Sequence, residues 1–117
     1  DIEADLRSAA GLAISRGVGP EHIAIDPGVG FGKTFSNNWT LIARLEALRG
    51  LGKPIVIGTS RKRFLRELVG PDLKSLEIAT AATSVAACLQ GARIVRVHDI
   101  SSHHLAMQVA GKVLTAD

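Results

Sequence analysis

The sequence predicts an α/β fold built around a parallel β-sheet. Short apolar runs rich in β-branched residues recur along the chain without alternating polar positions, which is typical of parallel strands buried on both faces. Longer segments with apolar residues at helical spacing lie before, between and after these runs. This order predicts strand–helix units joined by right-handed crossovers, and a single domain over residues 1–117.

The expected elements follow one another with short connections. The strands are expected at residues 23–27, 54–58 and 94–97. Helices are expected at residues 3–16, 37–49 with Ser36 as its N-cap, 76–90 and 102–114, with a further short helix from about Ser60 to Val69. Residues 76–90 are almost uncharged and rich in alanine, so this helix is expected to be buried on several sides.

The composition is that of an ordinary globular protein. The 117 residues are 46% hydrophobic and carry a formal net charge of +3. No apolar run reaches the ~20 residues of a membrane span, and a single cysteine excludes an internal disulfide, so we expect a soluble, cytoplasmic protein. Few aromatic residues argue against nucleic-acid binding. The chain begins at Asp1, so its length is not taken as that of a natural gene product.

A polar cluster follows each expected strand. The clusters are the segments 26–34, 59–63 and 96–99. Ligands bind at the carboxyl ends of the strands in parallel α/β folds, so three clusters at one edge predict a ligand site. Any one charged residue in these clusters is most simply explained as part of a solvent-exposed loop. That explanation is weaker for all three clusters together.

The glycine-rich segment after the first expected strand is neither a P-loop nor a dinucleotide fingerprint. It ends in Gly32-Lys33-Thr34, but the first glycine that a P-loop requires would fall on Pro27. The spacing also misses the Gly-x-Gly-x-x-Gly pattern. We expect the glycines to permit a tight turn and the close approach of a flat ligand.

The charged residues at the strand ends suggest distinct roles. Asp26 is expected to be half-buried, either binding amidine-like N–H groups of a ring or capping the glycine turn. Ser60, Arg61 and Lys62 are expected to begin a helix whose N–H groups bind an anion, the alternative being a basic exposed face. Arg96 and His98 alternate along a strand and share a face, which suits a polyphosphate.

The remaining candidates are assigned structural roles. Asp99 and Ser101 are expected to cap the last helix, His103 and His104 to lie on its surface, and Cys88 to be inert core.

Three motifs in order resemble the C-terminal part of the dihydropteroate synthase family. They are Asp26-Pro-Gly-Val-Gly-Phe-Gly-Lys33, Gly58-Thr-Ser-Arg-Lys62 and Arg96-Val-His-Asp99. The resemblance implies a (β/α)₈ barrel, of which this chain supplies the fifth helix and strands six to eight. It also implies that the N-terminal part of the barrel is missing, and that the protein forms a homodimer through its last helices.

The resemblance further implies a transferase reaction and its site. The family joins a dihydropterin pyrophosphate to 4-aminobenzoate and releases pyrophosphate, usually with Mg²⁺ held through the pyrophosphate. The implied catalytic residues are Asp26, Lys62 and Arg96, and the implied substrate-binding residues are Asp26, Gly30, Phe31, Ser60, Arg61, Lys62, Arg96 and His98. Arg63 stands where many members carry a small hydroxyl residue that holds the aminobenzoate carboxylate.

Two other functions remain open. A related pterin-binding barrel, such as a methyltetrahydrofolate-dependent methyltransferase, would share the aspartate but would not need Lys62, Arg96 and His98 for a pyrophosphate. A basic interaction module would use Arg61, Lys62, Arg63 and Arg66 on nucleic acid and would bind any duplex in a salt-sensitive way.

Overall fold

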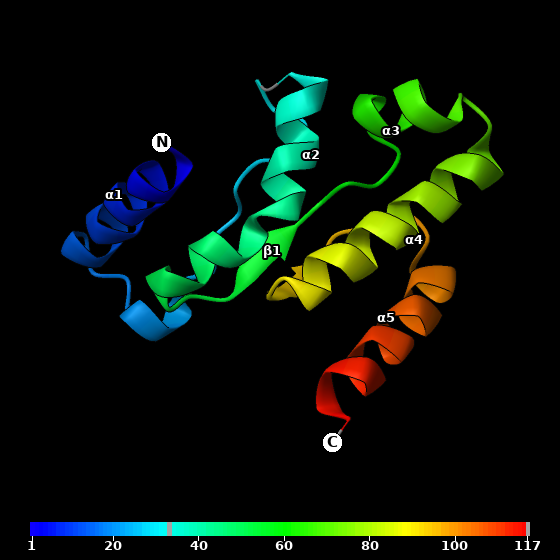
Figure 1. Cartoon of the computed structure of the whole chain (residues 1–117). Coiled ribbons are helices and arrows are strands. Elements are labelled where there is room, and N and C mark those ends of the chain that lie inside the picture. Colours follow the sequence, from blue (N-terminus) through cyan, green and yellow to red (C-terminus); the bar gives the residue numbers. More distant parts are fainter. Residues whose placement is uncertain (33, 117) are drawn as a thin grey trace.

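The computed structural model describes residues 1–32 and 34–116, and shows a short parallel sheet accompanied by helices (Figure 1). The helices are α1 (Ile2–Ser15), α2 (Phe35–Ala43), α3 (Arg63–Val69), α4 (Leu73–Leu89) and α5 (Ile100–Thr115), with 3-10 helices η1 (Pro20–His22) and η2 (Leu45–Leu51). The strands are β1 (Ile55–Ile57) and β2 (Ala92–Val95). Helices α1 and α5 lie at opposite ends of the molecule (Figure 1).

Strands β1 and β2 form the centre of the fold. They pair in parallel, with Ile55 opposite Ala92 and Ile57 opposite Val95, and an irregularity in register follows Ile55. The pairing continues past β2, because the Arg96 N–H donates to the Ile57 carbonyl at 3.0 Å. The expected third strand is thus present, but it begins two residues earlier than predicted because Gly91, at φ 112°, turns the chain directly out of α4.

The expected strand at residues 23–27 is reduced to a single parallel bridge. Ile25 donates its N–H to the Pro54 carbonyl at 2.8 Å and accepts from the Val56 N–H at 2.7 Å. The next bond of a parallel ladder would need an N–H on residue 27, and Pro27 has none, so the strand stops there. The prediction of a full strand is therefore wrong, although its direction and its place beside β1 are correct.

Several helix boundaries also differ from the predicted ones. Helix α2 begins after Thr34, whose Oγ1 accepts from the Asn37 N–H at 3.1 Å, so Thr34 rather than Ser36 is its N-cap. It ends at Ala43, and the chain continues as η2 instead of α-helix. Helix α4 begins at Leu73, because Asp72 accepts from the Ser75 N–H at 3.0 Å. Helix α3 begins at Arg63, three residues later than expected.

The core lies between the sheet and helices α2, α3 and α4. Ile55 and Ile57 of β1 pack against Phe64 and other apolar side chains of the helices. Trp39 of α2 meets the Phe64 ring edge-to-face, with ring centroids 5.0 Å apart. This core fixes α3 against the end of β1, where the second polar cluster leaves the sheet.

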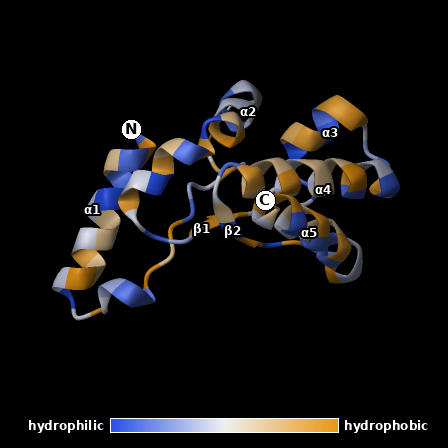
Figure 2. Ribbon diagram, turned by 60° about the horizontal axis from the view of Figure 1, so that its bottom comes forward, coloured by the Kyte–Doolittle hydropathy of each residue, from blue (hydrophilic) through white to orange (hydrophobic). Residues whose placement is uncertain are grey.

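Some apolar surface remains uncovered in the described residues. Ile94 of β2 is 45% exposed, so the expectation that this strand is buried on both faces is not met within the described part of the chain. Helix α5 exposes Leu105, Val109 and Val113. Figure 2 colours parts of α4 and α5 as hydrophobic. None of the described helices is long and apolar enough to cross a membrane.

Candidate functional site

The polar ends of β1 and β2 meet in one pocket. Its volume is about 230 Å³. It is lined by Gly58, Ser60, Lys62, Arg96, Val97 and His98. The expectation that these clusters share one edge of the sheet is therefore confirmed for residues separated by up to 40 positions in the sequence.

Asp26 lies beside this pocket and is paired with Arg96. The Arg96 Nη2 donates to Asp26 Oδ2 at 2.5 Å, and the other carboxylate oxygen, Oδ1, accepts from the Gly28 N–H at 2.8 Å. Both side chains are partly exposed, so the pair can be reached by a ligand. The Asp26 carboxylate thus caps the glycine turn, which is one of the two roles expected from the sequence. It also holds the Arg96 guanidinium beside the pocket.

Gly58 leaves just enough room for the Arg96 guanidinium. A Cβ on Gly58 would lie 2.8 Å from Arg96 Nη2 and 2.9 Å from Cζ. We predict that Gly58→Ala moves Arg96 until its Nη2 is beyond about 4 Å from Asp26, the limit of an ion pair. A crystal structure of the variant measures this distance. Gly11→Ala is the matched control, because nothing lies within 4 Å of a Cβ there. An unmoved Arg96 contradicts the prediction.

The glycine-rich loop is fastened to α2. The Gly30 N–H donates to Asn38 Oδ1 at 2.8 Å, and Asn38 is buried. Gly30 has φ 87°, and a Cβ there would lie 2.6 Å from Lys62 Cδ. The loop glycine therefore permits both a left-handed turn and the close approach of Lys62. Lys33, the last residue of this motif, lies outside the described residues.

Lys62 joins the glycine-rich loop to the pocket. Its Nζ donates to the Val29 carbonyl and lies 4.5 Å from the centroid of the Phe31 ring. The Phe31 ring is 66% exposed. The ammonium and the aromatic face form a cation–π contact at the surface. Lys62 and Phe31 together therefore offer an apolar ring beside a positive charge.

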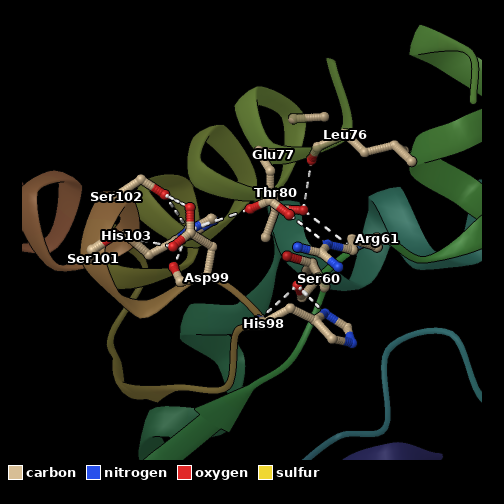
Figure 3. Close-up of polar contacts among 12 residues, drawn as sticks. Ser60, Arg61, Leu76, Glu77, Thr80, His98, Asp99, Ser101, Ser102 and His103 are labelled. Carbon is tan, nitrogen blue, oxygen red and sulfur yellow. Dashed lines mark hydrogen bonds and ion pairs between the residues drawn. The ribbon is translucent and has the colours of Figure 1, made fainter. Parts of the chain in front are cut away.

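Ser60 orients His98 in the pocket (Figure 3). The His98 N–H donates to Ser60 Oγ at 3.1 Å, and the same Oγ is 2.6 Å from His98 Nδ1. Because the oxygen accepts from the backbone, its hydroxyl hydrogen can donate to Nδ1. In the tautomer that this bond permits, a neutral His98 carries its ring hydrogen on Nε2, and that nitrogen is then a donor for a ligand.

Arg61 turns away from the pocket toward α4. Its Nε donates to Glu77 Oε1 at 2.5 Å, and its backbone N–H donates to Thr80 Oγ1 at 3.1 Å (Figure 3). The Lys62 N–H donates to the Thr59 carbonyl. These two N–H groups are already bonded within the protein, so they are not available to an anion, and α3 begins only after them, at Arg63. The basic side chains, not the backbone, supply the positive charge of the pocket.

The region where α5 begins corrects one more expectation. His103 is 2% exposed, not on the surface as predicted, and its Nδ1 is 2.9 Å from the Asp99 carbonyl. Asp99 is the N-cap residue of α5, as expected, but it accepts from the hydroxyl groups of Ser101 and Ser102. Hydrogen bonds from Ser102 and Ser101 hold the pKa of the Asp99 carboxyl below its ordinary value.

Cys88 of α4 is the free cysteine of the chain. The side chain is half-buried, and burial raises the pKa of the Cys88 thiol, which disfavours the reactive thiolate. In the part of the chain that the structure describes, no three His, Cys, Asp or Glu side chains are grouped to hold a metal ion.

Sequence reasoning missed the supporting residues of the pocket. Asn38, Glu77, Thr80 and His103 all hold the loops in place, yet none belongs to a strand-end cluster. A usable signal was present for Glu77, which is the single acidic residue in the otherwise uncharged segment 76–90.

The fold and the pocket together define a class of protein. A parallel α/β fold that gathers cationic side chains and one carboxylate at the carboxyl edge of its sheet binds small polar ligands there. Within this class the chain belongs to the pterin binding enzyme family, whose model matches residues 1–98.

Curated proteins and solved structures agree with this family. A dihydropteroate synthase of Mycobacterium leprae is 43% identical over 122 residues, which cover 99% of this chain and 43% of that protein. The dihydropteroate synthase of Xanthomonas albilineans, solved in complex with 7,8-dihydropteroate, is 33% identical to this chain and superposes with a TM-score of 0.92. The match covers 99% of this chain and 46% of the Xanthomonas chain. The Thermus thermophilus dihydropteroate synthase in complex with 6HMPPP is 37% identical to this chain, with a TM-score of 0.87. That match covers 97% of this chain and 45% of the Thermus chain. The chain therefore spans less than half the length of these relatives.

Proposed function

We propose that the complete polypeptide carrying this chain is a dihydropteroate synthase. It condenses a 6-hydroxymethyl-7,8-dihydropterin pyrophosphate with 4-aminobenzoate to give 7,8-dihydropteroate and pyrophosphate. The observation that carries the proposal is the pocket in which Lys62, Arg96 and His98 converge beside Asp26. The dihydropteroate synthases similar to this chain, one of them holding 7,8-dihydropteroate, support it.

Asp26 and Arg96 are proposed to bind the pterin. A carboxylate that already accepts one N–H and one guanidinium donor has the polarity to accept from the amidine-like N–H groups of a pterin ring. Arg96 presents a planar guanidinium that can stack on the ring and reach a phosphate. The negative charge of Asp26 also stabilises positive charge that develops on the pterin during the reaction.

Lys62, Gly30 and Phe31 are proposed to border the 4-aminobenzoate site. The exposed Phe31 ring offers an aromatic face, and the Lys62 ammonium lies over that ring. Gly30 lets the loop approach closely, because any side chain there would meet Lys62. Arg63 is exposed next to Lys62, and we assign it no role in binding the carboxylate.

Ser60, His98 and Arg96 are proposed to hold the pyrophosphate, with Arg61 shaping the turn that carries Ser60. His98 Nε2, oriented by Ser60, donates to a phosphate oxygen while Arg96 supplies a fixed positive charge. The residues at this pocket do not fit a direct Mg²⁺ site, because its lining is cationic and Asp26 is already paired with Arg96. We therefore propose that no residue of this chain binds Mg²⁺ directly and that the ion is held through the substrate pyrophosphate.

The proposed reaction breaks one C–O bond and one N–H bond and forms one C–N bond. The C–O bond between the pterin methylene carbon and pyrophosphate breaks, and its electron pair leaves with pyrophosphate. The amine nitrogen of 4-aminobenzoate then forms a C–N bond to that carbon and loses a proton to solvent. Asp26 stabilises the cationic pterin, while Lys62, Arg96 and His98 stabilise the developing negative charge, so catalysis is mainly electrostatic.

We propose that this chain is the C-terminal portion of an eight-stranded (β/α) barrel. Three consecutive parallel segments, Ile25, β1 and β2, lie side by side in chain order, as neighbouring barrel strands do. The radius of gyration is 14.8 Å, larger than the ~13 Å expected of a compact domain of this length. The partly exposed Ile94 on β2 fits a strand that packs against the rest of a barrel. The missing partner is then the N-terminal barrel half.

We also propose that the complete protein is a homodimer through its last helices. The supporting observation is the row Leu105, Val109 and Val113 on α5, each more than half exposed. These residues are four apart and so share one helix face. An apolar stripe of this kind is typical of an interface.

The proposal is tested by assaying the complete polypeptide and this chain separately. We expect the complete polypeptide to release pyrophosphate only when both the pterin pyrophosphate and 4-aminobenzoate are present, and this chain alone to release none. Calorimetry with pterin pyrophosphate and with methyltetrahydrofolate separates the synthase from a methyltransferase. No pyrophosphate release from the complete polypeptide overturns the proposed function, and release by this chain alone overturns the claim that it is an incomplete piece.

A further inference from the structure

We propose that Glu77 is a positioning residue that fixes the turn between β1 and α3, and thereby places Ser60 and Lys62 in the pocket. The inference rests on the proposed function and adds a residue to its site. Glu77 lies on α4, is not part of the pocket lining, and is joined to the turn that carries Ser60 and Lys62 by its ion pair with Arg61.

The turn has an unfavourable backbone conformation at Arg61. Its φ is 57°, and it is the single described residue other than glycine with a positive φ. A residue with a Cβ disfavours this left-handed region, so surrounding contacts must hold it there. Glycine would adopt the turn at no steric cost, so the presence of arginine points to a use for its side chain.

Two contacts from one face of α4 hold Arg61. Glu77 Oε1 accepts from Arg61 Nε at 2.5 Å, and Thr80 Oγ1 accepts from the Arg61 N–H at 3.1 Å. Glu77 and Thr80 are three residues apart and therefore lie on the same face of the helix. One contact fixes the side chain and the other fixes the peptide, so the turn is held at two points (Figure 3).

Glu77 is itself held in a buried setting. Its side chain is 17% exposed, and its Oε2 is buried without a hydrogen bond, 3.7 Å from His103 Nδ1. The Nδ1 hydrogen donates to the Asp99 carbonyl, so His103 gives Glu77 no hydrogen bond, and the ion pair with Arg61 is the contact that compensates the charge of Glu77. The carboxylate thus lies between Arg61 and His103. A buried carboxylate needs this compensation, which makes its position well defined.

The geometry of the pocket follows from the turn. Ser60, directly before Arg61, bonds both the backbone N–H and the ring of His98. Lys62, directly after it, bonds the Val29 carbonyl. A change in the Arg61 backbone would rotate both neighbours, so a contact on α4 controls two groups that we propose bind substrate. Glu77 also keeps the Arg61 charge on the α4 side of the turn.

The test is Glu77→Gln in the complete polypeptide. Glutamine keeps the size of the side chain but removes the charge that holds Arg61. We expect the affinity for inorganic pyrophosphate, measured by calorimetry, and kcat/KM to fall about tenfold. Glu67→Gln is the matched control, because Glu67 lies exposed on α3, and we expect it to change neither quantity. Unchanged affinity in Glu77→Gln, whatever its thermal stability, overturns the proposal.

A second variant separates positioning from general support of the fold. Arg61→Gly adopts the left-handed turn without strain and has no guanidinium for Glu77 to hold. In that background Glu77→Gln should have no further effect on pyrophosphate affinity, whereas a merely structural glutamate would lower it by the same factor in both backgrounds.

Failure of the proposed function is distinguishable from failure of this inference. If the unaltered polypeptide neither binds pyrophosphate nor forms product, the proposed function is wrong, and the crystal structure of Glu77→Gln then decides the role of Glu77. A displaced Arg61 turn with a broken Ser60–His98 contact supports the inference, and an unchanged turn overturns it.

Discussion

Replacing Asp26 with asparagine should lower kcat/KM for pyrophosphate release by the complete polypeptide about 100-fold to 1,000-fold, the usual cost of losing one preorganised electrostatic group. Asparagine has nearly the same shape but no charge, so it loses both the attraction for Arg96 and the stabilisation of a cationic pterin. Steady-state kinetics with the pterin pyrophosphate as the varied substrate measures the change.

The location of Asp26 argues that this loss is catalytic rather than structural. Its Oδ1 accepts from the Gly28 N–H, and an asparagine Oδ1 can accept the same bond, so the turn should persist. Asp5→Asn is the matched control, since Asp5 is exposed on α1 and far along the chain from the pocket. A variant Asp26→Asn that retains more than a tenth of the activity would show that Asp26 is not a catalytic residue.

The sequence was sufficient to predict that Ser60, Lys62, Arg96 and His98 lie together in one pocket. Lys62, Arg96 and His98 each follow an apolar strand, and the carboxyl ends of parallel strands share one edge whatever the loops between them do. The topology therefore brings these residues together before any detail of packing is known. Asp26 joins them even though its strand is reduced to one bridge, because a single parallel pairing at Ile25 is enough to set direction and position.

Details that depend on contacts between distant segments could not be predicted. The prediction of a full strand at residues 23–27 is wrong because Pro27 has no N–H to continue the pairing with β1. That loss can be recognised only once β1 is known to be the partner strand. Arg61 is a basic residue in a segment expected to bind an anion. Nothing in the neighbouring sequence shows that its guanidinium is instead paired with Glu77. His103 was expected at the surface, but its place one turn into α5 faces α4 and is buried. In each case local pattern was overruled by packing.

Phe64→Ala should be among the most destabilising substitutions in the chain. Phe64 is 1% exposed and meets Trp39 edge-to-face at 5.0 Å between ring centroids. Removing a buried aromatic ring loses its burial, its ring contact and the packing around it, typically about 3–5 kcal/mol of unfolding free energy. Denaturant unfolding of the complete polypeptide measures the loss.

The effect should extend from stability to the pocket, because Phe64 joins the two elements that carry it. Phe64 lies two residues after Lys62, and Trp39 directly follows Asn38, which holds the glycine-rich loop at Gly30. Loosening this contact lets α2 and α3 move apart and separates the loop from Lys62. Leu68→Ala on the exposed face of the same helix is the control, and it should cost at most about 0.5 kcal/mol. An equal loss from both variants would mean that Phe64 does not anchor α3, and that the turn before it is held from α4 alone.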